Sequence, residues 1–298
     1  MGREARSAWL FISVPLTVLM VFTLAPTVLG LGLSLFDWDG SGWPRFVGLA
    51  NYRGLAGDAS FGPALKNTLV FAALTVPASV LIGFLLACAV NAPWFRGRTT
   101  VRTMLFLPTV VSIVSIGFVW RWLLENQGGL VPEVMRRWGV EPPDFLSGGD
   151  AGGLGVISWP MLSIVMVQVW RSVGFCVVLY LASMQQINAS LYEAAECDGA
   201  GRWTILRRIT WPQVAPMTAF LFITSAIGAL QVFDVVVAMT GSTNMSAQTD
   251  RTRVLNTMVL AEFRQSRLGY ASAIGAVIFG LTALVTAAQL WATRRGRA

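Results

Sequence analysis

The sequence contains no histidine, only three cysteines and few charged residues, which make up 12% of its 298 positions. Histidine is the commonest metal ligand and proton shuttle, so its absence argues against both roles. The cysteines Cys88, Cys176 and Cys197 are scattered and match neither a disulfide pattern nor a metal-binding spacing. We therefore expect no metal site in this chain, and no catalytic or cofactor-binding residues stand out in it.

Hydrophobic residues, in contrast, make up 55% of the sequence. Because a soluble domain carries about 25% charged residues, this composition predicts an integral protein of the lipid bilayer. Spans of about 20 residues allow about six crossings in a chain of this length. The formal net charge of +7 comes with no nucleic-acid-binding motif. We therefore assign it to arginines at the membrane surface and expect no nucleic acid partner.

Six apolar segments, separated by polar loops, are the expected spans. They cover approximately residues 8–33, 67–90, 103–124, 156–184, 214–240 and 270–291. The first is longer than the apolar core of a signal peptide, so we expect it to remain as a membrane helix despite Pro15 and Pro26. We divide the chain into a first helix with its outer loop (1–66), a transmembrane core of five helices (67–291) and a basic tail (292–298).

Orientation follows from the basic residues next to the spans. Six spans place both termini, the 91–102 loop and residues 190–216 on the same side. The two sides carry similar numbers of arginines, but the basic clusters without acidic residues lie on the side of the termini. We therefore expect a multi-pass protein of the cytoplasmic membrane with both termini in the cytosol.

The longest polar interruption in the second half of the chain is residues 190–216. Ser190 and Glu193 have the spacing of a capping box, which predicts a helix start. Gly199 and Gly201 allow the left-handed conformation that ends a helix.

A second short helix of one or two turns is then expected over residues 202–209, before Trp211 and Pro212. Two short helices with a sharp corner suit the docking of a soluble partner. An ordinary cytosolic loop would explain the same pattern.

Charged residues inside spans are costly and are therefore candidates for function. Arg171 lies about 15 residues, or roughly 22 Å, from the outer start of the fourth span. It would serve either in a structural ion pair or as a donor that lines a pore. Asp234 lies about 20 residues, or roughly 30 Å, from the cytosolic start of the fifth span, near its outer end. Arg121 lies between two tryptophans and fits an anchor at the membrane surface.

Two helix faces in the spans carry polar or small side chains at helical spacing. Their members are Gln168, Ser172 and Phe175 in the fourth span and Ser225, Ala229 and Val232 in the fifth. Amides and hydroxyls beside an aromatic ring suit a sugar, because the ring covers the apolar face of the pyranose. Polar groups also join membrane helices to one another, so both interpretations stay open.

Residues 190–216 resemble the EAA loop of ATP-binding-cassette importer permeases. The positions that carry this resemblance are Tyr192, Glu193, Ala194, Ala195, Asp198, Gly199, Ala200 and Pro212. In that family the loop is the coupling helix that fits into a cleft of the ATPase subunit. By this resemblance, Glu193 orients the loop, Gly199 allows close approach, and Tyr192, Ala194 and Ala195 pack in the cleft.

Further segments are similar to the carbohydrate-uptake branch of the same family, of the maltose and glycerol-phosphate type. They are Asn51–Tyr52, residues 64–69, residues 102–122, Gln231–Asp234 and residues 269–273. The resemblance implies an all-α integral membrane protein with six transmembrane helices, the type I importer permease fold and a cytosolic coupling-helix loop.

The implied function is import of a sugar or sugar derivative, namely a mono-, di- or oligosaccharide or a glycerol phosphate. The implied partners are a second homologous permease, two ATPase subunits and an extracytoplasmic solute-binding protein. ATP and Mg²⁺ would bind to the ATPases, since this chain has no phosphate-binding loop. Gln168, Ser172, Phe175, Ser225, Ala229 and Val232 would line the substrate path.

Three other functions remain as alternatives. The nearest is an ATP-driven permease for a solute that is not a sugar. An ion-coupled secondary transporter would show inverted repeats or acidic ion sites in the membrane, and only Asp234 qualifies. A membrane enzyme would need a catalytic cluster, yet the acidic residues of the 125–150 loop form no motif.

Overall fold

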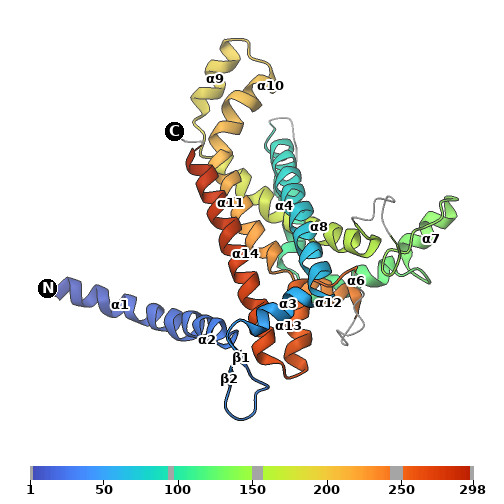
Figure 1. Cartoon of the computed structure of the whole chain (residues 1–298). Helices are drawn as coiled ribbons and strands as arrows, with labels where there is room; N and C mark the ends of the chain where they lie inside the picture. The colour runs from blue at the N-terminus through green and yellow to red at the C-terminus, as the bar shows by residue number, and fades with distance from the viewer. Residues whose placement is uncertain (1–2, 93–96, 150–156, 242–250, 296–298) are drawn as a thin grey trace. The chain divides into compact units, whose positions relative to one another are not determined.

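The computed structural model describes residues 3–92, 97–149, 157–241 and 251–295 (Figure 1). Contacts divide the chain into two units. The first comprises Met1–Gly62 and Leu255–Gly280, and the second comprises Pro63–Val254 and Leu281–Ala298. Helices α4 (Phe61–Asn91) and α14 (Leu268–Arg295) contribute residues to both.

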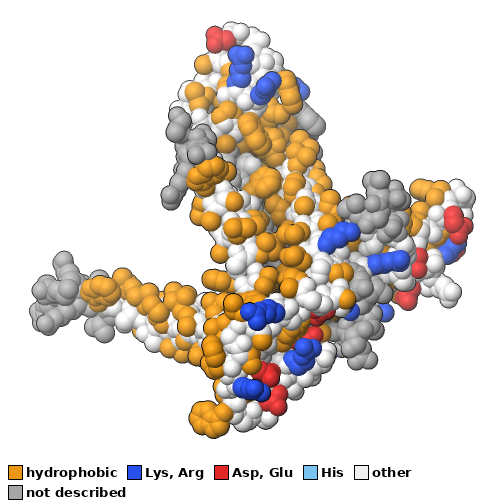
Figure 2. Space-filling model, in the orientation of Figure 1, with side chains coloured by type: hydrophobic (Ala, Val, Ile, Leu, Met, Phe, Trp, Pro, Cys, Tyr) orange, Lys and Arg blue, Asp and Glu red, His pale blue; other side chains and the backbone are white. Residues whose placement is uncertain are grey.

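The first unit begins with one long apolar helix. Its parts are α1 (Arg3–Leu19), the π turn η1 (Met20–Leu24) and α2 (Ala25–Leu33). Figure 2 shows apolar side chains over much of its visible surface, and Phe11 is 83% exposed. A helix that is apolar on all sides belongs in lipid or against another membrane helix. This agrees with the prediction that the segment is a membrane span.

A short hairpin, two short helices and the first part of a long helix complete the first unit. The elements are β1 (Phe36–Asp37), β2 (Arg45–Phe46), α3 (Ala50–Gly57), α13 (Leu255–Arg264) and the first part of α14. The strands pair antiparallel, with Phe36 opposite Phe46. The side-chain amide of Asn51 donates to the carbonyl oxygens of Ser34 (2.8 Å) and Phe36 (2.9 Å). These bonds fix α3 against the hairpin.

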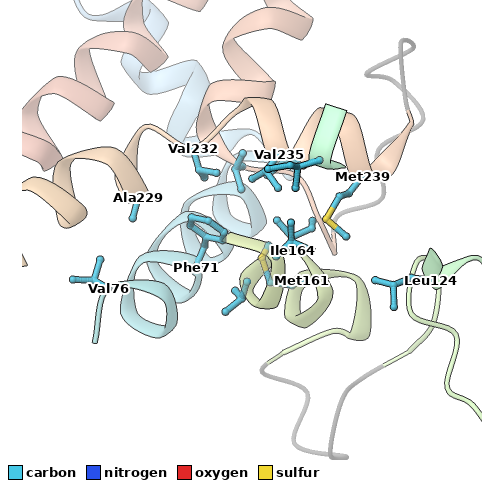
Figure 3. Close-up of a cluster of buried hydrophobic side chains, with 14 of the residues drawn as sticks. Phe71, Val76, Leu124, Met161, Ile164, Ala229, Val232, Val235 and Met239 are labelled. Atoms are coloured by element: carbon cyan, nitrogen blue, oxygen red, sulfur yellow. The ribbon is translucent and has the colours of Figure 1, made fainter. Parts of the chain in front are cut away.

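The second unit contains most of the membrane-length helices. Its elements between α4 and α14 are α5 (Arg98–Val110), α6 (Ile113–Leu124), α7 (Leu130–Arg137), α8 (Trp159–Met184), α9 (Ala189–Cys197), α10 (Arg202–Ile205), the π turn η2 (Leu206–Thr210), α11 (Trp211–Leu230) and α12 (Asp234–Thr240). One core cluster lies among α4, α6, α8, α11 and α12. Figure 3 shows Phe71, Ile164 and Val235 pointing into it.

Five stretches among the described residues are long and apolar enough to cross a membrane. They are Phe11–Leu33, Phe61–Asn91, Trp159–Met184, Arg202–Leu230 and Leu268–Thr293. The pair α5 and α6 satisfies the same criteria together, which makes six and agrees with the six expected spans. The expected start of the fourth span near residue 156 and the last three residues of the basic tail lie outside the described residues.

The span expected over residues 103–124 is not straight, because it consists of α5 and α6, which are bent by 97°. The two helices have different neighbours, since α5 packs against α8 and α6 packs against α12. A Cβ atom on Gly174 of α8 would collide with the backbone of Leu105, and one on Gly117 of α6 would collide with Ala238. Close packing through small residues is the main attraction between membrane helices, so these contacts hold the bend.

The fifth span also differs from its expected limits of 214–240. The helix starts at Arg202 and ends at Leu230, and α12 is a separate short helix after a break. Phe233, with φ −149° and ψ −63°, is not helical. The short helix expected over residues 202–209 is therefore not separate from the span, because the helix continues through the π turn η2 into α11.

Both π turns lie just before a proline. The turn η1 precedes Pro26 and η2 precedes Pro212, in each case with one residue between the turn and the proline. A proline ring clashes with the carbonyl four residues earlier in an α-helix. A π turn widens the helix at that carbonyl. The two prolines are therefore accommodated without ending the helix.

Candidate functional site

The first candidate site is the α9–α10 hairpin, which precedes η2 and α11 in the second unit (Figure 1). Helix α9 is capped by Asn188, whose side-chain oxygen accepts a hydrogen bond from the backbone N–H of Ser190 at 3.1 Å. The predicted capping box of Ser190 and Glu193 is therefore wrong. Asparagine and serine are both good N-caps, and the helix begins at the earlier one.

The Asp198-Gly199-Ala200 sequence forms the C-terminal cap of α9. Gly199 has φ +74°, as predicted. Its N–H donates to Glu196 O at 3.0 Å, and the N–H of Ala200 donates to Ala195 O at 2.9 Å. This pair of bonds is the Schellman motif. The same role predicted for Gly201 is wrong, because Gly201 is extended, with φ −69° and ψ 157°, and precedes α10.

The two faces of α9 differ in their surroundings. Glu193, Ala194 and Asp198 are exposed. On the other face, the hydroxyls of Tyr192 and Thr210 lie 3.2 Å apart, which joins α9 to η2. Tyr192 also lines a pocket of about 470 Å³ behind the helix. The hairpin therefore presents an exposed surface that carries Glu193 and Asp198 beside apolar residues such as Trp203, and Tyr192 supports it from behind.

The second candidate site is a pocket of about 180 Å³ between α5, α8 and α11, called here the α5–α8–α11 pocket. It is lined by Thr109, Arg171, Ser172, Phe175, Cys176, Thr224 and Ser225. Ser172, Phe175 and Ser225 were predicted for the substrate path, and the structure brings them together. The sequence analysis missed Thr109 and Thr224, whose hydroxyls inside apolar segments were the available signal.

Hydrogen bonds hold the polar side of this pocket in place. Gln168 Nε2 donates to Ser172 Oγ at 3.1 Å, so these residues share a face as predicted. Thr109 Oγ1 donates to the carbonyl oxygen of Arg171 at 3.1 Å and ties α5 to α8. Gln168 Oε1 and Arg171 Nε are buried and have no hydrogen-bond partner among the described protein atoms. Unused polar atoms at a pocket are available to a polar ligand.

Ala229 and Val232, also predicted for the path, lie in the apolar core rather than in this pocket. Each is less than 10% exposed and packs in the cluster of Figure 3, where both are labelled. Val232 follows the end of α11 at Leu230, so it does not continue the helical face of Ser225. The single chain thus places two of the six predicted path residues away from the other four.

The two candidate charges in the membrane influence each other. Arg171 lies near the middle of α8, about 18 Å from its start at 1.5 Å per residue. Asp234 is exposed at the first residue of α12, where the helix dipole favours a negative charge. The carboxylate of Asp234 interacts electrostatically with the guanidinium of Arg171. No ion pair joins these two side chains in the described structure. The guanidinium of Arg171 therefore lines the pocket without being paired to Asp234.

A polar cluster in the first unit was not anticipated from the sequence. Arg267 Nη1 lies 2.8 Å from Glu262 Oε2, and the guanidinium stacks over the Tyr270 ring at 4.5 Å. The Tyr270 hydroxyl donates to Asp58 Oδ2 at 2.9 Å. Burial raises the pKa of Glu262, and nearby Asp58 raises it further, whereas Arg267 opposes both effects. The cluster ties α3 to the start of α14.

Membrane-length helices around a polar pocket, together with a capped polar hairpin, are the architecture of a transport permease. The chain belongs to the family of binding-protein-dependent transport system inner membrane components, whose model matches residues 68–297. This confirms the predicted family and a multi-pass membrane protein.

Two relatives and one solved structure illustrate the similarity. The chain is 32% identical to the lactose transport system permease protein LacF of Rhizobium radiobacter, over 97% of this chain and 94% of the relative. It is 31% identical to the diacetylchitobiose uptake system permease protein NgcF of Streptomyces coelicolor, over 96% and 81%. A bacterial alginate ABC transporter, solved with an alginate pentasaccharide-bound periplasmic protein, matches with a TM-score of 0.82 at 24% identity, over 98% and 96%. The predicted importer permease fold is therefore confirmed.

Proposed function

We propose that this chain is one permease subunit of an ATP-driven importer that carries a sugar or sugar derivative across the cytoplasmic membrane. The α5–α8–α11 pocket is the observation that carries the proposal. It combines hydroxyls, a guanidinium and the half-exposed ring of Phe175 near the middle of the membrane helices, and the amide of Gln168 is hydrogen-bonded to Ser172 beside it. The hydroxyl, amide and guanidinium groups suit the hydroxyls of a sugar, and the ring suits its apolar face. The relatives named for lactose and diacetylchitobiose support this class of substrate.

The size of the pocket fits a path shared between two permeases. At about 180 Å³ it is smaller than the roughly 300–1,000 Å³ of most ligand sites. A second homologous permease would supply the facing wall. Gln168, Ser172, Phe175 and Ser225 would then contact the sugar directly, and Ala229 and Val232 would support the helices that carry them.

The α9–α10 hairpin is proposed to dock on the partner ATPase from the cytosol. Glu193 and Ala194 would contact the ATPase, since they lie on the exposed face of α9. Tyr192 would instead hold α9 against Thr210 of its own chain. The Schellman cap formed by Asp198, Gly199 and Ala200 ends the docking helix at a fixed point.

One continuous helix joins this docking surface to the pocket. From Arg202 to Ser225 it extends about 35 Å at 1.5 Å per residue. When ATP closes two ATPase subunits below the hairpins, movement of α9 would pass through Thr210 and η2 into α11. Thr224 and Ser225 would then move relative to Ser172 on α8, which changes the side of the membrane to which the pocket opens.

The remaining partners follow from the same proposal. An extracytoplasmic binding protein would deliver the sugar, as the family description implies and as the periplasmic protein in the alginate transporter structure supports. ATP and Mg²⁺ would be held by the two ATPase subunits, and both termini of this chain would lie in the cytosol. This chain would catalyse no reaction of its own.

The decisive experiment measures ATPase activity of the complete complex in lipid nanodiscs, with and without its binding protein. The ligand panel contains mono-, di- and oligosaccharides, glycerol phosphates, amino acids, peptides and inorganic phosphate. Stimulation by one sugar or glycerol phosphate is the expected result. Stimulation only by a solute outside that class would establish the non-sugar alternative, and uptake driven by an ion gradient without ATP would establish a secondary transporter.

A further inference from the structure

A separate pocket of about 480 Å³ lies between the end of α4, the start of α5 and the end of α8. All ten of its lining residues belong to the second unit, and none is shared with the α5–α8–α11 pocket. They include two arginines and no acidic residue. The pocket therefore has an uncompensated positive charge, and neither the sugar path nor the α9–α10 hairpin uses it.

The two arginines form its charged end. Arg98 and Arg102 are four residues apart on α5, so they lie on the same face of the helix. Arg98 Nη2 donates to the carbonyl oxygen of Ala92 at 2.9 Å, which holds the guanidinium over the end of α4. Thr99 and Thr103 add hydroxyls beside them. Arginine forks recognise phosphate oxygens through paired, charge-assisted hydrogen bonds.

The other end of the pocket is apolar. Phe106 follows Arg98 by eight residues, or about 12 Å along α5. Val178 and Leu181 of α8 complete this wall, and Leu181 is buried. A single pocket thus offers cationic donors at the start of a membrane helix and apolar side chains two turns further along it. This arrangement matches an amphiphilic ligand with an anionic head and an apolar tail.

We propose that this pocket binds an anionic phospholipid. The phosphate of the headgroup pairs with Arg98 and Arg102, and the first part of an acyl chain lies along Phe106, Val178 and Leu181. Basic pockets between membrane helices are known to suit anionic lipid headgroups. A soluble phosphate would pair with the same arginines but would leave the apolar wall unused. The bound lipid would clamp the start of α5, whose Thr109 contacts the pocket proposed for sugar.

The test uses the complete transport complex, purified in detergent and stripped of lipid. Dioleoyl phosphatidylglycerol, dioleoyl phosphatidylcholine or inorganic phosphate is added back, and bound lipid is counted by native mass spectrometry alongside the melting temperature. Phosphatidylglycerol is expected to bind and stabilise, and the double variant Arg98→Gln/Arg102→Gln is expected to lower its affinity by about tenfold or more. The matched control Arg207→Gln/Arg208→Gln removes two exposed charges of η2, outside the pocket, and is expected to retain the lipid.

A second variant tests the apolar wall with both charges in place. Val178→Trp fills that end of the pocket and is expected to weaken phosphatidylglycerol binding as well. Equal binding of the two lipids, or equal loss in the double variant and its control, would overturn the proposal. Stabilisation by inorganic phosphate equal to that by phosphatidylglycerol would also overturn it in favour of a soluble anion. Because no sugar or ATP enters the measurement, its result is independent of the transport function proposed above.

Discussion

The hydroxyl oxygen of Tyr192 lies 3.2 Å from that of Thr210, so a single hydrogen bond joins the exposed helix α9 to the helix that reaches the polar pocket. Thr210 is the last residue of η2 and is buried. The bond therefore links α9 to the turn that leads into α11.

Tyr192→Phe removes this hydrogen bond and keeps the ring. We expect a loss of about 1 kcal/mol in hairpin stability, the usual net value of one hydrogen bond. The amount of substrate transported per ATP hydrolysed should fall, because α9 would move without α11. The matched control is Tyr52→Phe, which removes the bond from Tyr52 to Ser34 Oγ (2.7 Å) in the first unit. An equal loss of transport in both variants would contradict the claim that the bond between Tyr192 and Thr210 couples α9 to α11.

Gly199→Ala tests the helix cap. At φ +74° a side chain costs about 1–2 kcal/mol, so the end of α9 should loosen and coupling to the ATPase should weaken. Gly201→Ala is the control two residues later, where φ is −69° and a Cβ meets no atom within 4 Å. Both variants are compared by hydrogen exchange of residues 189–201 and by ATP-dependent uptake in proteoliposomes. Similar exchange in the two would contradict the assignment of the cap to Gly199.

Gly174→Ala is expected to destabilise the folded chain, since the added methyl group would collide with the backbone of Leu105 on α5. Overpacking of this kind costs about 1–3 kcal/mol. In contrast, Gly228→Ala on α11 meets nothing within 4 Å and should be neutral or stabilising by up to about 1 kcal/mol. Thermal denaturation in detergent measures both. A melting temperature for Gly174→Ala that equals wild type would show that α5 does not pack closely on α8.

Arg171→Gln should impair transport while the complex still assembles, because it removes the guanidinium that lines the pocket. Arg171→Lys should retain part of the activity, since the charge stays but the fork of donors is lost. Uptake and substrate-stimulated ATPase activity are measured together with subunit stoichiometry. If Arg171 served only in assembly, both variants would lose subunits in proportion to their loss of transport.

Glu262 gives the first unit a defined pH dependence. Its pKa in the folded chain is raised, chiefly by burial, above the ordinary value of 4.5. The folded state therefore holds this proton more tightly than the unfolded state does. Stability from Glu262 is fully present below pH 4.5 and is lost as the pH rises through the folded pKa.

Glu262→Gln should remove the pH dependence that this carboxyl contributes. The difference in melting temperature between the variant and wild type should therefore change as the pH rises from 4.5 through the folded pKa of Glu262. Glu133→Gln on α7, whose carboxylate is exposed, is the control. A difference that stays constant from pH 4 to pH 8 would show that the Glu262 carboxyl titrates alike in the folded and unfolded chain.

The spans and the hairpin could be predicted because hydropathy and glycine positions are local signals. The breaks after Val110 and Leu230 could not, because the segments on both sides of each break are apolar and only a few polar residues stand between them. These ends depend on which neighbour each helix meets. Helix α5 packs on α8 whereas α6 packs on α12, and α11 packs on α8 whereas α12 packs mainly on α6. For this reason Val232, which was predicted to share a helix face with Ser225, lies beyond the end of that helix.

The candidate site was predictable where its residues share one regular helix. The i, i+4 spacing of Gln168 and Ser172 anticipated their contact of 3.1 Å. Thr109 reaches the same pocket from α5, 62 residues earlier in the chain, so only the folded structure brings it there. Ser190 was predicted as the helix cap, but in the folded chain the cap is Asn188, which the sequence analysis did not consider.

The π turn η2 carries one further consequence. Such a turn contains one residue more than an α-helical turn, and each residue of an α-helix rotates the side-chain direction by about 100°. The angle about the helix axis between α10 and the pocket face of Ser225 is therefore set by a single inserted residue. A relative lacking that residue would direct the same docking surface toward a different side of the membrane helices, even if every other residue were unchanged.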